Sequence, residues 1–274
     1  MKKFLSIFLA ALIAVGFTST AFAALKGDVN GDGATTSADA LAVLQYSVGQ
    51  SKKIDKAKAD LNKDGSINSA DALEILQISV GKSAAFDVPT TLNDTVNFYC
   101  NSLKTAYGKK MTLKYTYTES GTLADLTAKT QEPYSDTINK TKECENGVYK
   151  GTSTKVESVN PGFSFDAKGV ANVSVTQKSD GNYLVKLVLK EEKTDSSKSP
   201  AYNTKAAFGF ISTASNGTVT YTGTTLELTV DNNGNALGLT VKMPYVNEYT
   251  ETVNSKTHSF KDTGSMDYTA TYIY

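Results

Sequence analysis

A segment of 23 residues occurs twice near the start of the chain, at residues 28–50 and again at residues 60–82. The copies are DVNGDGATTSADALAVLQYSVGQ and DLNKDGSINSADALEILQISVGK, and they are identical at 14 of the 23 positions. Chance does not account for two such copies at an offset of 32 residues, so the segment is an internal duplication. We therefore expect the same local structure to form twice.

Each copy opens with the pattern of a twelve-residue calcium loop. Such a loop has side-chain oxygens at its first, third and fifth places, a Gly at the sixth for the sharp turn, and a carboxylate at the twelfth. Calcium is a hard cation that takes about six to eight oxygen ligands, and alternate places of a tightly wound loop face one centre. The predicted ligands are Asp28, Asn30, Asp32, the Ala34 carbonyl, Thr36 and Asp39 in the first copy, and Asp60, Asn62, Asp64, the Ser66 carbonyl, Asn68 and Asp71 in the second. The sequence thus predicts two bound calcium ions.

Residues 1–23 have the pattern of a cleaved secretory signal. Lys2 and Lys3 precede an apolar run, and Ala21-Phe22-Ala23 forms a small-residue cleavage site. We expect a secreted mature protein that begins near Ala24 and has no membrane anchor.

A short helix is expected after each loop. Leu41, Leu44 and Val48 recur at helical spacing, and their counterparts are Leu73, Leu76 and Val80. Gly49 and Gly81 then end the helices. An ordinary EF-hand pair is the alternative, but it needs a helix before each loop and usually has Glu at the twelfth place. The first loop begins only a few residues after the expected cleavage site, which leaves no room for such a helix.

These residues resemble the type I dockerin, a small calcium-dependent module with which secreted proteins of cellulosome-forming anaerobic bacteria attach to the cohesin domains of a scaffoldin. The resemblance covers about residues 25–86 and includes both loops and both helices. It implies a small all-α module of two calcium loop–helix (F-hand) motifs, a cohesin partner and an extracellular location on a cellulosome-like complex. Thr35 departs from the family pattern, which usually has an apolar residue there, such as Ile67 in the second copy.

The resemblance also implies which side chains contact the cohesin. In dockerins these stand at the tenth and eleventh loop places and about two turns into the helix. The corresponding residues are Ser37, Ala38, Leu44 and Gln45 in the first half, and Ser69, Ala70, Leu76 and Gln77 in the second. Because the two sets are identical, the resemblance implies that one cohesin can bind in either of two orientations. The alternative for Leu44 and Leu76 is that they are core residues.

The rest of the chain divides into a linker at residues 87–91 and a second domain at residues 92–274, after a dockerin at residues 24–86. Residues 92–108 form a predicted amphipathic helix that Thr91 caps and Gly108 ends, with Leu92, Val96, Tyr99, Leu103 and Tyr107 on its apolar face. From Met111 onward the apolar period changes to two, which indicates strands with one buried face. We expect about eight or nine antiparallel strands in one curved sheet around the helix, hence an α+β domain.

Composition limits the function of this second domain. Without Lys2 and Lys3 the chain has 26 Lys and no Arg against 28 acidic residues, a formal charge of −2, so nucleic acid is not an expected partner. The single His is His258, which favours a solvated strand residue over a catalytic base. Cys100 and Cys144 allow either one disulfide or two free thiols.

The sequence favours a non-catalytic binding domain as the cargo of the dockerin. Plant polysaccharide is a candidate ligand, because the chain has 15 Tyr for sugar stacking although it has no Trp. Candidate stacking residues are Tyr245, Tyr249, Tyr268, Tyr272 and Tyr274. Two alternatives stay open: a glycoside hydrolase or other polysaccharide-active enzyme, for which Glu191, Glu192, Glu248 and Glu251 are carboxylate candidates, and a domain that binds protein or lipid.

Overall fold

The structure is a computed structural model, and it describes residues 25–155, 166–195 and 216–274. The expected secretory signal at residues 1–23 lies outside the described residues. No helix among the described residues is both long enough and apolar enough to span a membrane.

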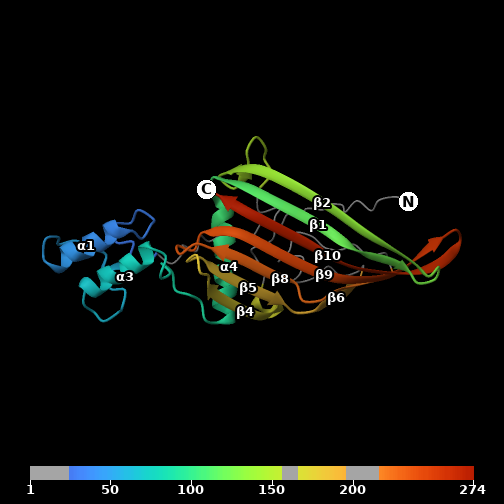
Figure 1. Cartoon of the computed structure of the whole chain (residues 1–274), viewed down its shortest axis with the longest axis horizontal. Helices are drawn as coiled ribbons and strands as arrows, with labels where there is room; N and C mark the ends of the chain where they lie inside the picture. The colour runs from blue at the N-terminus through green and yellow to red at the C-terminus, as the bar shows by residue number, and fades with distance from the viewer. Residues whose placement is uncertain (1–24, 156–165, 196–215) are drawn as a thin grey trace.

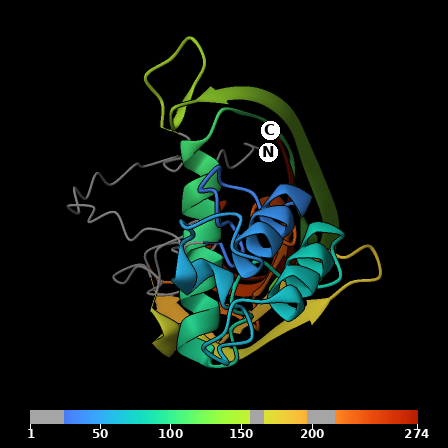
Figure 2. The ribbon, with the colours of Figure 1, turned by 90° about the vertical axis from the view of Figure 1, so that its left-hand side faces the viewer.

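The N-terminal module contains two helices that repeat each other, α1 (Ser37–Ser47) and α3 (Ser69–Ser79), with one turn of helix, α2 (Lys56–Ala59), between them. Thr36 and Asn68 cap the two long helices through capping boxes, as their loop sequences favour. Gly49 and Gly81 follow the helix ends with φ values of +78° and +76°, the left-handed conformation in which Gly ends a helix. The helices α1 and α3 pack against each other (Figures 1 and 2).

The core of this module is small. It consists of Ala40, Val43, Ala59, Leu61, Ala72, Ile75, Ile78 and Ala85. Thr35 is buried beside this core, and its hydroxyl donates a hydrogen bond to the carbonyl of Lys26 (2.8 Å). The departure from an apolar residue at this place is therefore accommodated, because the buried hydroxyl has a partner.

Helix α4 (Leu92–Gly108) opens the C-terminal domain and has the predicted bounds. The Thr91 hydroxyl accepts a hydrogen bond from the Asp94 N–H (3.2 Å) and caps the helix. Val96, Tyr99 and Leu103 are buried, so the predicted apolar face packs against the sheet. 

The C-terminal domain is α+β, as predicted, with a large antiparallel sheet. Its strands are β1 (Met111–Asp125), β2 (Thr130–Glu145), β3 (Val148–Tyr149), β4 (Val170–Gln177), β5 (Tyr183–Leu189), β6 (Glu192–Asp195), β7 (Thr218–Tyr221), β8 (Thr225–Val230), β9 (Ala236–Val253) and β10 (Lys256–Ile273). The spatial order is β3-β2-β1-β10-β9-β8-β5-β4, and the short strands β6 and β7 pair with each other, β7 also with β9. A short 3-10 helix, η2 (Ala167–Gly169), precedes β4.

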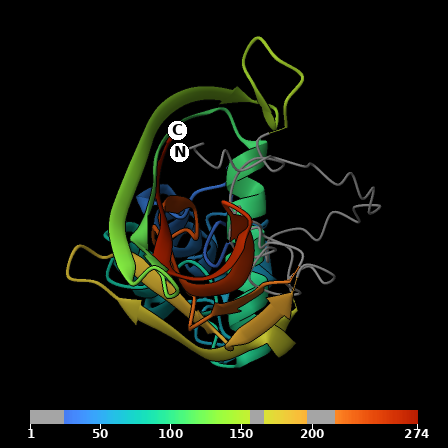
Figure 3. The same ribbon diagram turned by 90° about the vertical axis from the view of Figure 1, so that its right-hand side faces the viewer.

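The sheet curves strongly, and α4 lies on its concave side (Figures 1 and 3). Tyr107 of α4 contacts Tyr272 of β10, with 6.1 Å between the ring centroids, so the side of β10 that carries Tyr272 faces α4 and is the concave side. The long strands β1, β2, β9 and β10 continue beyond α4 as a narrowing arm (Figure 1). We call the concave side of this arm the inner face, and we assign residues to it by the alternation of each strand.

The number and length of the strands differ from the sequence prediction. The sheet has ten strands within the described residues, against the expected eight or nine. The extent of strand β2 was not predicted, because most of its side chains are exposed and so show no apolar alternation. The distal half of β1 and the hairpin between β9 and β10 were also missed. Their half-buried residues carry polar and small side chains in place of apolar ones.

The two parts of the chain meet at adjacent residues. Ala85 belongs to the core of the N-terminal module, whereas Phe86 belongs to the core of the C-terminal domain. The turn between β8 and β9 also contacts the module: Asn232 donates a side-chain hydrogen bond to the carbonyl of Ile78 (2.5 Å) and accepts one from the Ala85 N–H (2.7 Å) at its backbone carbonyl. The junction thus has polar backbone contacts in addition to the covalent connection.

Candidate functional site

The first loop of the duplication turns its side-chain oxygens toward its own backbone. Asp28 Oδ2 accepts a hydrogen bond from the Gly33 N–H (3.3 Å). Asn30 Oδ1 accepts one from the Asp32 N–H (2.8 Å), and Asp32 Oδ1 accepts one from the Ala34 N–H (3.0 Å). Gly33 has a φ of +89°, which explains why Gly stands at the sixth place. The first, third and fifth places therefore hold their oxygens along one tight turn.

The second loop repeats this arrangement. Asp60 Oδ2 accepts a hydrogen bond from the Gly65 N–H (3.0 Å), and Gly65 has a φ of +83°. Asn62 Oδ1 accepts one from the Asp64 N–H (3.0 Å), and Asp64 Oδ1 accepts one from the Ser66 N–H (2.7 Å). The duplication is thus a repeat of hydrogen-bond geometry as well as of sequence.

The twelfth-place carboxylates are fully buried and hold each loop to its helix. Asp39 accepts hydrogen bonds from the N–H groups of Val29 (3.0 Å) and Thr36 (2.9 Å). Asp71 makes the corresponding bonds in the second loop. These two residues therefore close the loops and complete the capping boxes of α1 and α3 at once.

The loops fit calcium in the kind of ligand that they offer. In the part of the chain that the structure describes, no three His, Cys, Asp or Glu side chains gather as a metal group. In each loop the carboxylate at the twelfth place, Asp39 or Asp71, is already hydrogen-bonded to the backbone. The remaining predicted ligands are carboxylate, amide, hydroxyl and backbone carbonyl oxygens, the hard donors that calcium takes. Calcium would have to share the side-chain oxygens of the first, third, fifth and twelfth places with backbone hydrogen bonds.

A lysine distinguishes the first loop from the second. The ammonium group of Lys58 lies 3.5 Å from Asp28 Oδ2, and both side chains are largely buried. An ammonium group beside a ligand carboxylate repels a second cation. The two loops are therefore similar in geometry but differ in local charge.

The predicted partner-binding residues all lie at the surface. All eight are exposed: Ser37, Ala38, Leu44, Gln45, Ser69, Ala70, Leu76 and Gln77. Leu44 and Leu76 are 38% and 39% exposed, so the alternative that they are core residues is wrong. Each helix thus presents the same outward face, and the core is formed by the opposite faces of α1 and α3.

Comparison with known families identifies this module. Residues 26–77 match the family model of the dockerin type I domain. The N-terminal module is a type I dockerin. This match supports attachment of the cellulosome type through a cohesin, and type I dockerins bind calcium in general. The whole chain matched no curated protein and no solved structure.

The dockerin has four further exposed apolar residues that were not assigned to partner binding. Leu41 and Leu73 are 56% and 57% exposed, and Val48 and Val80 are 69% and 68% exposed. Together with Leu44 and Leu76 they form one apolar stripe along each helix. Their helical spacing was visible in the sequence, but it did not distinguish a core stripe from a partner stripe. We call the exposed residues at positions 37, 38, 41, 44, 45 and 48 of α1 and its C-cap, with their counterparts 32 positions later, the two docking faces.

The residues that suggested catalysis in the C-terminal domain have ordinary partners. His258 Nδ1 lies 2.6 Å from Asp125 Oδ2, and His258 is mostly buried, which differs from the predicted solvated residue. Glu248 is exposed and forms an ion pair with Lys261 (3.3 Å). Cys100 and Cys144 are both free thiols, and both belong to or pack against the core. 

Most of the tyrosines proposed for sugar stacking are buried. Tyr245, Tyr268 and Tyr272 lie in the core, so their rings offer no open face to a ligand, contrary to the sequence interpretation. Tyr249 is half-buried and Tyr274 is half-exposed. Of the five candidates, these two keep accessible ring surface.

A cluster of acidic and phenolic side chains lies on the inner face. Tyr134 donates a hydrogen bond to Asp262 Oδ1 (2.8 Å) and also contacts the Tyr245 hydroxyl closely. Tyr117 donates to Glu119 Oε2 (3.3 Å). Burial raises the pKa of the Glu119 carboxyl and of the Asp262 carboxyl, in each case as the largest effect. We call these five residues the acid–tyrosine cluster.

The raised carboxyl pKa values predict a pH-dependent effect of Glu119→Gln. A carboxyl group whose pKa is higher in the folded state favours folding below its unfolded pKa, near pH 4, and this contribution is lost as the pH rises through the folded pKa. The variant has no such group. The melting temperature of its C-terminal domain, minus that of the wild-type domain, should therefore increase from pH 4 to pH 7, by on the order of 2 °C. Thermal denaturation at both pH values measures this difference. Glu248→Gln is the matched control and should change little, and an equal shift in both variants would contradict the prediction.

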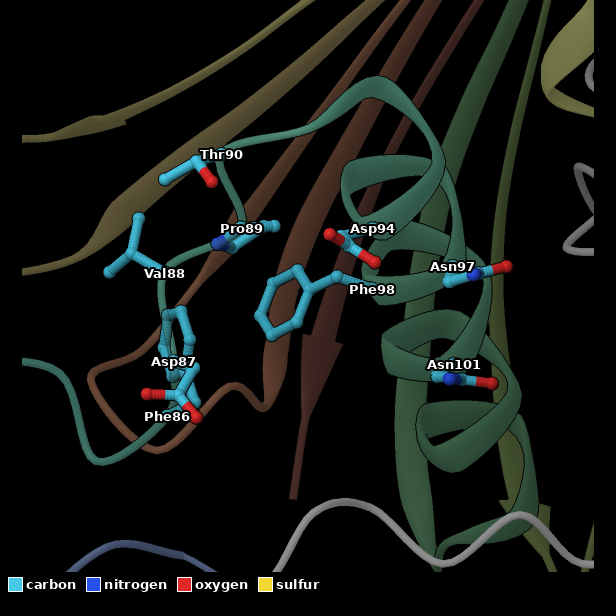
Figure 4. Close-up of a pocket in the computed structure, with 9 residues that line it drawn as sticks. All are labelled: Phe86, Asp87, Val88, Pro89, Thr90, Asp94, Asn97, Phe98 and Asn101. Atoms are coloured by element: carbon cyan, nitrogen blue, oxygen red, sulfur yellow. The ribbon is translucent and has the colours of Figure 1, made fainter.

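A pocket lies at the junction of linker and α4 (Figure 4). Phe86 and Phe98 point toward each other on its apolar side and stack with 4.6 Å between the ring centroids. Asn97 and Asn101 point away from these rings (Figure 4). The pocket thus borders a packing contact between the linker and α4, and the side chains of Asp87 and Asp94 also line it.

Proposed function

We propose that the protein is a secreted subunit that attaches, through calcium-dependent binding of its dockerin to a cohesin, to the scaffoldin of a cellulosome-like complex that degrades polysaccharide. The observation that carries this proposal is the pair of docking faces, because six large apolar side chains in the same arrangement on two helices are exposed. A monomeric protein rarely exposes such apolar stripes without a binding role. The predicted secretory signal supports an extracellular location.

The proposal assigns two calcium ions to the dockerin, one for each loop. The residues that would hold them are the twelve ligands predicted above, from Asp28 to Asp39 and from Asp60 to Asp71. When bound, calcium supplies positive charge that neutralises the loop carboxylates and so fixes each loop against its helix. The N-terminal ends of α1 and α3, which carry Ser37 and Ser69, are thereby held in position for the partner.

The equal exposure of the two docking faces supports two alternative binding orientations. The exposed fractions of the three matching pairs of apolar residues, such as Leu41 and Leu73, differ by at most one percentage point. The contact of the β8–β9 turn with Ile78 does not cover either face. A cohesin would therefore meet the same chemistry on either helix.

Calorimetry of the mature protein against cohesins of the producing organism tests the proposal. We expect tight binding in calcium and no measurable heat of binding after excess chelator, because the loops position both docking faces. A cohesin that was heat-denatured is the control for unspecific association. Failure to bind any cohesin in calcium, or binding that survives chelation, would overturn the proposed attachment.

For the cargo we propose a non-catalytic domain that binds polysaccharide. The half-buried acidic and aromatic side chains of the inner face support this ligand, since carboxylates accept hydrogen bonds from hydroxyl groups and aromatic rings stack on sugar faces. The competing proposals are a glycoside hydrolase and a domain that binds protein or lipid. Release of reducing ends from soluble polysaccharide would identify the hydrolase and overturn the non-catalytic role.

A further inference from the structure

Two glycines shape the inner face where they lie in one row of paired residues across the sheet. We call such a row of inner-face residues a rung, so neighbouring rungs are two residues apart along each strand. Gly121 of β1 and Gly264 of β10 are directly opposite each other, with Tyr134 of β2 beside Gly121 and Tyr245 of β9 beside Gly264. A Cβ atom on Gly121 would lie 2.7 Å from the Tyr134 hydroxyl, and one on Gly264 would lie 2.8 Å from the Tyr245 hydroxyl. The missing side chains therefore allow the two phenols to cross the sheet and meet.

The meeting phenols place one carboxylate on each side of this rung. Glu119 stands one rung away, and it lies 3.4 Å from the Tyr245 hydroxyl. Asp262 stands one rung away in the other direction, and it accepts the hydrogen bond from Tyr134. Since Asp262 pairs with Leu123, the two acidic residues are four residues apart along the strands, about 13 Å between their backbone positions.

Hydrogen-bond acceptors outnumber donors in this cluster. Among the described residues, the donors that reach Glu119 and Asp262 are the hydroxyls of Tyr117, Tyr134 and Tyr245, each with a single proton. Two ionised carboxylates accept up to about eight hydrogen bonds. No lysine among the described residues lies within ion-pair distance of either carboxylate. Further donors must therefore come from outside the cluster.

A buried amide is directed into the same area. Asn247 of β9 is directly opposite Asp262 in the register, on the same face as Tyr245 and Tyr249. Asn247 is only 5% exposed, and within the described residues its side-chain oxygen has no hydrogen-bond partner. A buried acceptor without a donor destabilises the fold, so a ligand that supplied the donor would recover this free energy. 

Aromatic side chains continue the inner face beyond Asn247. Tyr249 and Phe260 occupy the next rung and stack with 5.2 Å between their ring centroids. Both are half-buried, as are Glu119 and Asp262, so a ligand has access to all four side chains. The same surface thus offers aromatic rings and hydrogen-bond acceptors side by side.

We propose that the inner face of the arm binds a neutral polysaccharide chain, with Glu119, Asp262 and Asn247 as acceptors for sugar hydroxyls and the Tyr249–Phe260 pair as the stacking surface. This inference rests on the proposed polysaccharide-binding function and names its site. The ligand is extended, because the surface runs from Glu119 to Phe260, whose positions lie six residues, or about 20 Å, apart along the strands.

Calorimetry with soluble hexaoses of cellulose, xylan and mannan tests the site. We expect at least one hexaose to bind the wild-type protein, and Glu119→Gln and Asp262→Asn each to weaken that binding about tenfold, or about 1.4 kcal/mol. Both substitutions keep the shape of the side chain, and circular dichroism confirms that each variant folds. Glu248→Gln, on the opposite face of β9, is the matched control and should bind like wild type.

The possible outcomes distinguish an error in the assigned binding site from an error in the proposed polysaccharide-binding function. If a hexaose binds but both variants bind it as tightly as wild type, the assigned site is wrong and the polysaccharide-binding function stands. If no neutral hexaose binds, both the site and the proposed cargo function are wrong, whereas cohesin binding measured on the same samples tests the docking role separately. Binding of a chitosan hexaose alone would overturn the proposal in favour of a cationic ligand.

Discussion

Chelation of calcium is expected to unfold the dockerin and to leave the C-terminal domain folded. The dockerin core contains eight buried apolar side chains, four of them Ala, and a module of about 60 residues buries only about 60% of its surface. An ion at a hundred times its dissociation constant stabilises the folded state by about 2.7 kcal/mol. The C-terminal domain has a separate core that includes none of these side chains, so it does not depend on the ions. Scanning calorimetry should show two transitions, of which only the lower one moves with calcium concentration.

Loop substitutions distinguish this effect from unspecific action of the chelator. Asp60→Ala removes a predicted ligand and a hydrogen-bond acceptor for Gly65, so it should lower the first transition in calcium as chelation does. Glu132→Gln removes one exposed carboxylate of β2 and should leave both transitions unchanged. A dockerin transition that does not respond to calcium would show that the loops fold without ions.

The dockerin was predictable from sequence because its signals are local. Capping residues, left-handed glycines and loop oxygens act within about twelve residues of one another, and the duplication presents each signal twice. The same local reasoning placed α4 between Thr91 and Gly108. It did not resolve which side of each helix faces the core. Leu44 and Val43 are both apolar, and only packing decides which of them is buried.

The arm of the C-terminal domain was not predictable in the same way. Apolar alternation indicates a strand only where one face is buried, and β2 is exposed along most of its length. The acid–tyrosine cluster depends on the register of four strands, which brings Tyr134 next to Tyr245 across 111 positions of the sequence. Gly121 and Gly264 are the only local trace of this arrangement, and a glycine within a strand indicates a close approach without naming its partner.

Replacing both Leu44 and Leu76 with Asp is expected to weaken cohesin binding strongly, whereas either replacement alone should have a small effect. Each residue stands in the middle of one docking face, where a well-packed side chain contributes about 2 kcal/mol or more, so the double variant should lose at least about thirtyfold in affinity. A single variant keeps one intact face, and the loss of one of two equal orientations reduces the association constant by about twofold, or about 0.4 kcal/mol. Calorimetry of the four proteins with one cohesin measures both effects.

The size of the single effects decides how many faces are used. Leu126→Asp replaces an exposed leucine of the C-terminal domain and controls for the added charge. If Leu44→Asp alone removed binding and Leu76→Asp did not, the cohesin would use α1 only, and the duplication would serve the fold of the dockerin rather than a choice of orientation. If the double variant bound like wild type, neither docking face would be the cohesin site. The prediction of two orientations therefore requires both small single effects and a large combined one, because only two independent and equivalent faces produce that pattern.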